Sequence, residues 1–332
     1  MPEQNLQVLL AHRPEGEPTP DCFEIRESPV PQPGAGEVLI RHEWLSLDPY
    51  MRGRMSAAKS YAKPVEIGAV MEGQCVGTVE RSEHPGFAPG DRVAGGYGWQ
   101  QWSAMPGERL RKLPPGLDRP SLALGILGMP GLTAYVGMSD IGQPKAGETV
   151  VVSAATGAVG GVVGQLAKLA GARAVGIAGG AEKCRFAEQE LGYDACLDHR
   201  GPDLKAALDE ACPEGIDVYF ENVGGAVQRA VFPRLRDFGR MAMCGMVAEY
   251  NARELQPGPN LMDCVRKRLR IQGFIVSDSW DRIGEWQAKA WPLVQEGRLR
   301  YREDVVHGLR EAPAAFIGLL RGENFGKLVV EV

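Results

Sequence analysis

Apolar positions follow two different periods along the chain. In the first third, short runs of alternating or continuous apolar residues are separated by turns rich in proline and glycine, which predicts strands rather than helices. The strands expected from this pattern lie at residues 5–10, 23–28, 37–44, 74–79 and 91–94. Closely spaced short strands with such turns are typical of a small barrel-like β domain.

From about Pro120 onward, apolar runs of strand length alternate with segments of helical period. The strands expected here lie at residues 150–153, 174–178, 195–198, 217–221, 240–244 and 271–275. This alternation predicts a doubly wound parallel sheet. The tail returns to the first pattern, with strands expected at 298–302 and 327–332 around a helix at 311–321. We therefore predict an α/β chain with two domains: 126–297 holds the parallel sheet, and 1–125 with 298–332 forms a discontinuous, barrel-like β-rich domain.

A glycine turn follows the first strand of the parallel series. The β-branched run ending at Ser153 leads into Ala155-x-Gly157-x-x-Gly160, and the helix after it ends before Gly171. A nucleotide pyrophosphate needs close approach to backbone N–H groups, which side chains would obstruct, and it gains from the positive end of a helix. The turn therefore predicts a dinucleotide site. Its structural alternative is an ordinary strand-to-helix turn.

The end of the second strand indicates which dinucleotide. In NAD sites an acidic residue stands about 20 residues after the glycine turn and binds the ribose hydroxyls. Here Gly179 and Gly180 occupy that place, and Lys183 and Arg185 follow. The acidic residue of NAD sites is therefore missing, and two cationic side chains follow in its place. Both differences favour binding of the 2′-phosphate of NADPH. Two alternatives stay open. Glu182 could be the acidic residue of an NAD site in a displaced position, and Lys183 and Arg185 could be ordinary solvated charges on a helix.

Composition and charge exclude several classes of protein. The chain has 332 residues, 44% hydrophobic and 24% charged, and a net charge of −5, which suits a soluble two-domain protein rather than a nucleic-acid partner. The basic run at residues 266–270 is expected to be a solvated helix end. No apolar run is long enough to span a bilayer and the N-terminus has no signal-peptide pattern, so we expect a cytoplasmic protein.

Cysteines and histidines give no metal-binding pattern. The seven cysteines are scattered with no C-x-x-C pair, and none of the five histidines stands at ligand spacing from a cysteine. This argues against a disulfide framework and a structural zinc lobe. We predict no metal.

Several stretches, taken together, resemble a known family. They are Ser46–Met55, Leu127–Tyr135, the glycine turn, Ala178–Cys184, Glu221–Gly225, Cys244–Asn251, Gln272–Val276 and Glu323–Lys327. Together they resemble the zinc-independent medium-chain dehydrogenase/reductases over nearly the whole chain. Within these, they resemble the branch of leukotriene B4 12-hydroxydehydrogenase, prostaglandin reductase and 2-alkenal reductase, with the bacterial NADPH-dependent curcumin reductases.

The resemblance implies a Rossmann domain with a GroES-like β-rich domain, NADPH as cofactor, and a small-molecule enone or enal as substrate. Hydride would go to the β-carbon of the α,β-unsaturated carbonyl, and the resulting enolate would be protonated at the α-carbon. It further implies a homodimer formed through the outer edge of the parallel sheet, whose open strand edge would seek a partner.

The resemblance also assigns site residues one by one. Those expected to bind the cofactor are Met129, Thr133, Thr156, Gly157, Ala158, Val159, Gly160, Gly179, Lys183, His199, Asn222, Cys244, Gly245, Tyr250, Phe274, Ile275, Val276 and Asn324. His199 stands where many relatives have tyrosine.

Two tyrosines are the candidates for catalysis. Tyr50 follows a turn signal, and Tyr250 follows the carboxyl end of the fifth parallel strand, where such sheets bind ligands. Either hydroxyl can donate to the enone oxygen or relay a proton. For each, the alternative is a half-buried packing residue.

Substrate residues are assigned more loosely. The candidates are Tyr50, Arg52, Tyr61 and Tyr97. Arg52 and Arg54 could meet a substrate carboxylate or could form structural ion pairs, and Tyr97 could equally belong to the barrel core with Trp99 and Trp102. Two other functions remain open: a zinc-independent NADPH:quinone oxidoreductase, and a non-catalytic NADPH-binding protein.

Overall fold

The computed structural model describes residues 4–254 and 256–332. The chain divides into two compact units. The first unit is Met1–Gly125, Glu303–Asn324 and Leu328–Val332, and the second is Ile126–Arg302 and Phe325–Lys327. The division predicted from sequence also falls after residue 125, but it places the second boundary at 297/298. In the part of the chain that the structure describes, no helix is both long and apolar enough to span a membrane.

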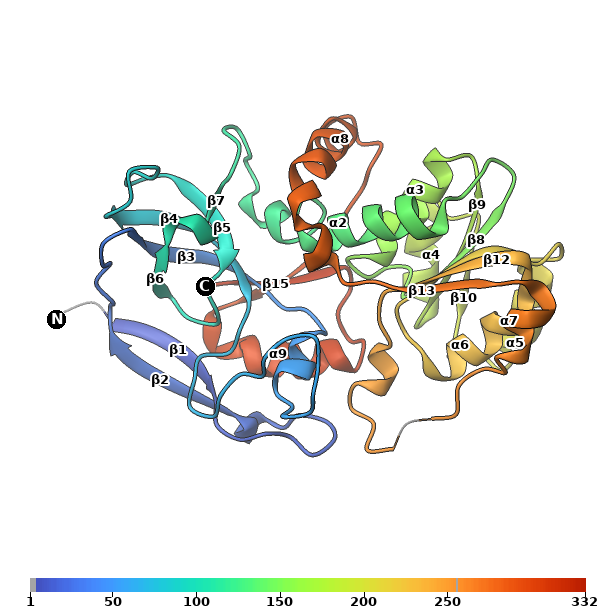
Figure 1. Cartoon of the computed structure of the whole chain (residues 1–332), viewed down its shortest axis with the longest axis horizontal. Coiled ribbons are helices and arrows are strands. Elements are labelled where there is room, and N and C mark those ends of the chain that lie inside the picture. The colour runs from blue at the N-terminus through green and yellow to red at the C-terminus, as the bar shows by residue number, and fades with distance from the viewer. Residues whose placement is uncertain (1–3, 255) are drawn as a thin grey trace. The chain divides into compact units, whose positions relative to one another are not determined.

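Antiparallel strands build the first unit (Figure 1). Its strands are β1 (Gln4–Leu10), β2 (Phe23–Pro29), β3 (Glu37–Ser46), β4 (Gln74–Ser82), β5 (Arg92–Gly96), β6 (Trp102–Pro106), β7 (Arg111–Lys112), β14 (Glu303–His307) and β15 (Lys327–Glu331). Strands β1 and β2 form a hairpin. The others form one sheet in the order β14-β15-β3-β4-β5-β7, with β6 also paired to β3. The helices are α1 (Met51–Arg54) and α9 (Ala312–Leu320).

Residues from both ends of the chain share the core of the first unit. The Trp99 ring stacks on Phe23 at 5.7 Å between ring centroids and meets the edge of Phe316, from α9, at 5.6 Å. Strand β15 pairs with β3, so Val330 lies opposite Leu45. The predicted discontinuous β-rich domain is confirmed, because the tail supplies part of this sheet and of its core.

A six-stranded parallel sheet forms the centre of the second unit. Its strands are β8 (Thr149–Ser153), β9 (Arg173–Ala178), β10 (Ala195–Asp198), β11 (Ile216–Glu221), β12 (Leu235–Met243) and β13 (Arg270–Gly273). The order is β10-β9-β8-β11-β12-β13, with every pairing parallel. The predicted doubly wound sheet is confirmed. The chain reverses its direction across the sheet between β8 and β11, and doubly wound folds bind ligands at this switch point.

Helices cover both faces of this sheet, and in Figure 1 α3 lies above the strands while α5, α6 and α7 lie below. They are α2 (Met129–Val136), α3 (Gly160–Leu169), α4 (Ala181–Gln189), α5 (Leu204–Ala211), α6 (Gly225–Val231), α7 (Met262–Lys267) and α8 (Ile283–Gln295). Burial on both faces explains why the central strands are apolar at successive positions, as in the fully buried Thr149–Ser153.

One predicted strand is wrong. Residues 298–302 are not part of a strand, although Arg302 O accepts a hydrogen bond from Lys327 N at 2.8 Å, and β14 begins only at Glu303. The backbone there is satisfied by a side chain: Arg300 N donates to Gln165 Oε1 at 2.7 Å, and Gln165 Nε2 donates to Arg300 O at 2.8 Å. A buried glutamine therefore takes the place of a neighbouring strand.

Candidate functional site

The glycine turn between β8 and α3 has no room for side chains at its key positions. A Cβ atom at Gly160 would lie 2.2 Å from the carbonyl oxygen of Ala154, and one at Gly157 would lie 3.2 Å from the same oxygen. Ala154 itself has a φ of 52°. The first turn of α3 starts directly behind Gly160, so its N–H groups face the turn and can receive an anion.

Alanine replaces the usual first glycine because the neighbouring strand makes room for it. A Cβ atom at Gly176, on β9, would lie 2.7 Å from the methyl group of Ala155. The Ala155 methyl is fully buried. The glycine needed for close packing has moved from the turn to the adjacent strand, and the backbone of the turn stays accessible.

Positive side chains gather where β9 and β10 end. A Cβ atom at Gly179 would lie 3.0 Å from His199 Nε2 and 3.2 Å from Arg200 Nε. Burial, then the charge of Arg200 and, more weakly, that of Lys183 hold the pKa of His199 below its ordinary value. Two cationic side chains beside a histidine that can take up a proton are suited to an anion such as a 2′-phosphate.

Asp198 shapes the same loop through hydrogen bonds to its backbone. Its Oδ1 accepts hydrogen bonds from Gly180 N and Arg200 N, both at 2.9 Å. These backbone bonds, the larger causes, lower the pKa of the Asp198 carboxyl. Its charge is engaged in holding the loop that carries Gly179 and Arg200.

Phe325, from the tail, lies beside Lys183 in the second unit. Its ring is 5.0 Å from the Phe186 ring, edge to face, and the Arg302 guanidinium lies 3.9 Å above it. The Lys183 ammonium is 6.0 Å from the same ring. These contacts orient Lys183 at the start of α4. Asn324, the preceding residue, belongs to the first unit.

A buried carboxylate lies at the switch point between β8 and β11. Glu221 has no exposed surface, and Ser153 at the end of β8 donates its hydroxyl to Glu221 Oε1 at 2.9 Å. Ser153 Oγ in turn accepts from Asn222 N at 2.8 Å, and Asn222 Nδ2 donates to Ser153 O at 2.8 Å. Asn222 is therefore fixed beside the glycine turn.

The end of β12 carries three more of the predicted residues. Cys244 N and Gly245 N both donate to the carbonyl oxygen of Glu221, at 3.0 and 3.1 Å. A Cβ atom at Gly245 would lie 2.9 Å from the Tyr250 hydroxyl. The structure thus brings Asn222, Cys244, Gly245 and Tyr250 together at the carboxyl ends of β11 and β12.

Helix α2 and the segment after β13 meet close by. Thr133 is buried in α2 and donates its hydroxyl to Met129 O at 2.8 Å. Further along, a Cβ atom at Gly137 would meet both Phe220 and Phe274, whose rings contact each other edge to face at 6.2 Å. Phe274 is thus held between β11 and the end of α2. Ile275 and Val276 follow it, at the entrance to the 3₁₀ segment Val276–Arg282.

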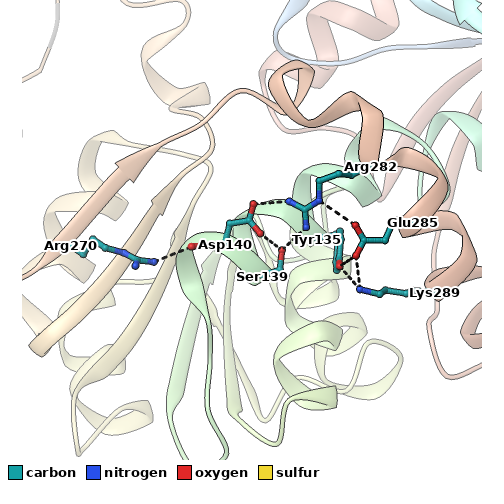
Figure 2. A network of polar contacts seen from close by, with 7 residues as sticks. All are labelled: Tyr135, Ser139, Asp140, Arg270, Arg282, Glu285 and Lys289. Atoms are coloured by element: carbon teal, nitrogen blue, oxygen red, sulfur yellow. Dashed lines mark hydrogen bonds and ion pairs between the residues drawn. The ribbon is translucent and has the colours of Figure 1, made fainter.

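A network of polar contacts joins this segment and α8 to α2 (Figure 2). Tyr135 donates its hydroxyl to Glu285 Oε1 at 2.6 Å and also contacts the ammonium of Lys289. The guanidinium of Arg282 donates to Asp140 Oδ2 at 2.7 Å and lies 5.1 Å from the Tyr135 ring. Figure 2 shows that these side chains lie close together although they come from two stretches, residues 135–140 and residues 282–289.

In the first unit, Arg54 organises the predicted substrate loop. Its guanidinium lies 5.3 Å from the Tyr50 ring and 4.7 Å from the Tyr61 ring, and it pairs with Glu72 at 3.3 Å. Burial, then Asp48 and Glu72, raise the pKa of the Tyr50 hydroxyl above its ordinary value. Tyr50 therefore keeps its proton at neutral pH and can act as a hydrogen-bond donor.

Two other candidates of this unit have structural contacts. Arg52 is buried and donates to the carbonyl oxygen of Gly16 at 2.7 Å. Tyr97 is buried in the core, its ring 5.2 Å from His42, and its hydroxyl has no hydrogen-bond partner among the described residues. Trp99 and Trp102 are buried as well. Tyr97 is therefore a residue of the barrel core, as the alternative interpretation of the sequence had it. A role for Tyr97 in substrate binding stays a prediction.

Sequence reasoning missed Arg200, Ser153 and Glu221. Arg200 follows His199 directly, so its proximity to Gly179 could have been inferred from the pairing of β9 with β10. Ser153 and Glu221 end two strands that are adjacent in space and 68 residues apart in sequence. The signal was a polar residue at the end of each of two apolar strands.

The described residues hold one cluster of the kind that could bind a metal ion: His12, Asp21 and Cys22. His12 Nε2 faces Asp21 Oδ2 at 3.0 Å, and His12 Nδ1 faces Cys22 Sγ at 3.9 Å. Hydrogen bonds account for these contacts without an ion, and His12 and Asp21 are solvent-exposed. The absence of a metal stays a prediction.

Comparisons with known proteins agree with this geometry. Residues 6–113 match the family described as the N-terminal domain of oxidoreductase, and residues 158–296 match the family described as zinc-binding dehydrogenase. The NADPH-dependent curcumin reductase of Escherichia coli (strain K12) is 51% identical over 336 residues, covering 99% of this chain and 97% of that protein. The chain belongs to the medium-chain dehydrogenase/reductases.

Two further members of this family are similar over almost their whole length. The 2-alkenal reductase (NADP(+)-dependent) of Nicotiana tabacum is 41% identical, covering 99% of this chain and 97% of that protein. The crystal structure of CurA in complex with NADPH from Vibrio vulnificus is 50% identical with a TM-score of 0.94, covering 98% of this chain and 99% of that one. The family branch predicted from the sequence is confirmed.

Proposed function

We propose that this protein is an NADPH-dependent reductase of the carbon–carbon double bond in α,β-unsaturated ketones and aldehydes. The observation that carries the proposal is the 51% identity to a curcumin reductase over 99% of the chain. The glycine turn and the cations around Gly179 suit the pyrophosphate and the 2′-phosphate of the cofactor. When bound, NADPH supplies the hydride.

Each group of site residues has a part in this reaction. The turn from Thr156 to Gly160 holds the pyrophosphate, and Lys183, His199 and Arg200 hold the 2′-phosphate. Thr133, Cys244 and the chain from Phe274 to Val276 surround the nicotinamide. These assignments are supported by the small or absent side chains of the glycine turn, which allow a ligand to approach the backbone closely.

Either Tyr50 or Tyr250 donates to the carbonyl end of the substrate. Negative charge develops on the carbonyl oxygen as hydride arrives at the β-carbon, and a hydroxyl that donates to this oxygen stabilises the enolate. Tyr50 is suited to this role, because burial keeps its proton in place. The enolate is then protonated at the α-carbon.

The activity is tested by following NADPH oxidation with an enone, with a quinone and without an acceptor. We expect turnover with the enone. Turnover with the quinone alone would instead indicate a quinone oxidoreductase, and NADPH binding without any turnover would indicate a non-catalytic protein.

The tyrosines are tested separately. Tyr50→Phe and Tyr250→Phe should each lower kcat with an enone, by about 10²-fold for a lost general acid. NADPH affinity should change little in Tyr50→Phe. Full turnover in both variants would contradict the assigned roles.

We further infer a homodimer formed through the outer edge of the parallel sheet, and a cytoplasmic location. Strand β13 is the last of the sheet, and an open edge favours pairing with a second copy. Helix α7, which directly precedes β13 in the sequence, exposes Met262 and Val265, the latter at 73% of its surface. Val265→Glu should convert a dimer to a monomer in light scattering, whereas Leu169→Glu, at an exposed apolar position on α3, should not.

A further inference from the structure

The buried carboxylate of Glu221 has an environment suited to a permanent negative charge. Its Oε1 accepts from Ser153 Oγ at 2.9 Å, from Val223 N at 2.7 Å and from Gly224 N at 3.0 Å, and its Oε2 accepts from the Tyr219 hydroxyl at 2.8 Å. Two of these donors are backbone N–H groups, which cannot accept a proton in return. Such a donor set stabilises the anion.

These four donors are neutral groups, so they stabilise the charge without cancelling it. Glu221 has no exposed surface, and screening by solvent is therefore weak at its position. The charge is felt by its neighbours: burial, and then Glu221, raise the pKa of the Cys244 thiol to about 12. The pKa of the Tyr219 hydroxyl is also raised, first by burial and second by the charge of Glu221.

The position of this charge in the fold matters as much as its presence. Glu221 ends β11, and its Oε1 is bonded to Ser153 at the end of β8. The carboxyl ends of these two strands form the switch point where a dinucleotide binds in this kind of sheet. Glu221 also supports Cys244 and Gly245 through its own carbonyl oxygen.

We propose that Glu221 makes the site bind NADP⁺ more tightly relative to NADPH, and so favours the release of hydride from the bound cofactor. This rests on the proposed function. The oxidised nicotinamide carries one positive charge more than the reduced ring, and an uncancelled negative charge nearby attracts only the oxidised form. The differential attraction is a property of this side chain rather than of the pyrophosphate or 2′-phosphate contacts, which are the same in both forms.

The test compares the affinities of the two cofactor forms, without substrate. Dissociation constants for NADPH and NADP⁺ are measured by fluorescence and calorimetry in the wild type and in Glu221→Gln, which keeps the shape and removes the charge. We expect the affinity for NADP⁺, relative to NADPH, to fall by about three- to tenfold, as for unit charges about 12 to 25 Å apart at an effective dielectric constant of about 20.

A matched variant separates charge from positioning. Ser153→Ala removes one donor to Glu221 and the acceptor for Asn222 N, but it leaves the carboxylate in place. It should weaken both cofactor forms by a similar factor. Glu221→Met, an apolar residue of similar length, should repeat the effect of Glu221→Gln and serves if the glutamine variant does not fold. An unchanged ratio in a folded charge-free variant would overturn the proposal.

A second readout needs no cofactor. Removing the charge should lower the pKa of Cys244, so alkylation of its thiol should become faster at a fixed alkaline pH in Glu221→Gln, as followed on the Cys244 peptide by mass spectrometry. An unchanged rate in a folded variant would mean that Glu221 carries no charge and would overturn the proposal. Failure of the wild type to bind either cofactor would instead contradict the proposed function.

Discussion

At the scale of single residues, the cluster around Gly179 shows how electrostatics can select a cofactor. His199 lies beside Arg200 and Lys183, so partial desolvation, the charge of Arg200 and more weakly that of Lys183 lower the pKa of its imidazole. A 2′-phosphate reverses that balance, because it attracts the imidazolium. The pKa of His199 must therefore be higher with NADPH bound than without it.

This difference predicts a pH dependence of binding. A group whose pKa rises on binding contributes fully below its free-state pKa, and the contribution is lost as pH rises through the bound-state pKa. NADPH affinity should therefore fall as the pH rises, and the fall should begin below the ordinary histidine pKa of about 6.5. NADH lacks the 2′-phosphate and should show little change. In His199→Phe the dependence of NADPH binding should disappear, and a slope that persists in this variant would assign it to another group.

Glycine at position 160 is required by a backbone contact. In Gly160→Ala the new methyl group meets the Ala154 carbonyl oxygen, so either the turn or α3 must shift. We expect a loss of about 1–3 kcal/mol in the free energy of unfolding and a fall in NADPH affinity of about tenfold or more. Gly284→Ala is the control, since a Cβ there meets nothing within 4 Å. Equal behaviour of the two variants in thermal unfolding and NADPH titration would contradict this account.

Sequence predicted the residues whose chemistry is local. Gly157 and Gly160 could be identified because the turn, the strand before it and the helix after it are contiguous. The roles of Arg200 and Glu221 depend on which strands become neighbours, and their sequence neighbourhood does not state this. The sequence identified Ala155 as a variant of the glycine fingerprint. That Gly176 makes room for the Ala155 methyl group could not be predicted without knowing the register of β8 against β9.

At the scale of elements, α2 is fixed mainly by a close contact with α8. The indole of Trp286 is buried and donates to Ile126 O at 2.7 Å. A Cβ at Gly131 would lie 1.9 Å from that same oxygen and 2.5 Å from Trp286 Nε1. The surrounding ion pairs of Figure 2, by contrast, are solvent-exposed, and exposed ion pairs contribute little.

Two substitutions on consecutive residues test this difference. Trp286→Ala should lower the free energy of unfolding by about 3–5 kcal/mol, because it opens a cavity and leaves Ile126 O without its donor. Glu285→Gln should have a much smaller effect. Denaturant unfolding followed by circular dichroism measures both, and a larger loss for Glu285→Gln would contradict the argument.

Acid should affect the same network in a defined direction. Lys289, then Tyr135, lower the pKa of Glu285 to about 2. A carboxyl with a depressed pKa contributes stability above its unfolded-state pKa, and this contribution is lost as the pH falls toward about 2. The difference in unfolding midpoint between wild type and Glu285→Gln should therefore shrink between about pH 5 and 2, and a difference that grew on acidification would have the wrong sign.

The elements that sequence predicted well are those with continuous apolar patterns. Strands β8, β9 and β11 are buried along most of their length, and their apolar runs match their observed bounds within about one residue. The segment 298–302 failed because its alternating pattern arises from one buried leucine, Leu299, and from the long-range contact of Arg300 with Gln165. Alternation over so few residues does not distinguish a strand from an anchored loop.

At the scale of the whole molecule, the first unit depends on the last residues of the chain. Strand β15 lies between β14 and β3 in the sheet, and Val330 is fully buried. Deleting residues 328–332 removes only residues of the first unit. The deletion should destroy hydrogen-exchange protection in β3 and β4 while β8 and β9 remain protected. Retained protection in β3 and β4 would show that the sheet closes without β15.

The discontinuity of the first unit also sets an order of events during synthesis. The second unit is almost complete once residue 302 has left the ribosome, whereas β3 waits for a partner that is translated last. Until then the nascent chain presents an unpaired strand edge with apolar residues such as Leu45 beside it, a surface prone to association with other chains. Production of this protein should therefore depend on chaperone supply and on translation rate more than its compact native state suggests.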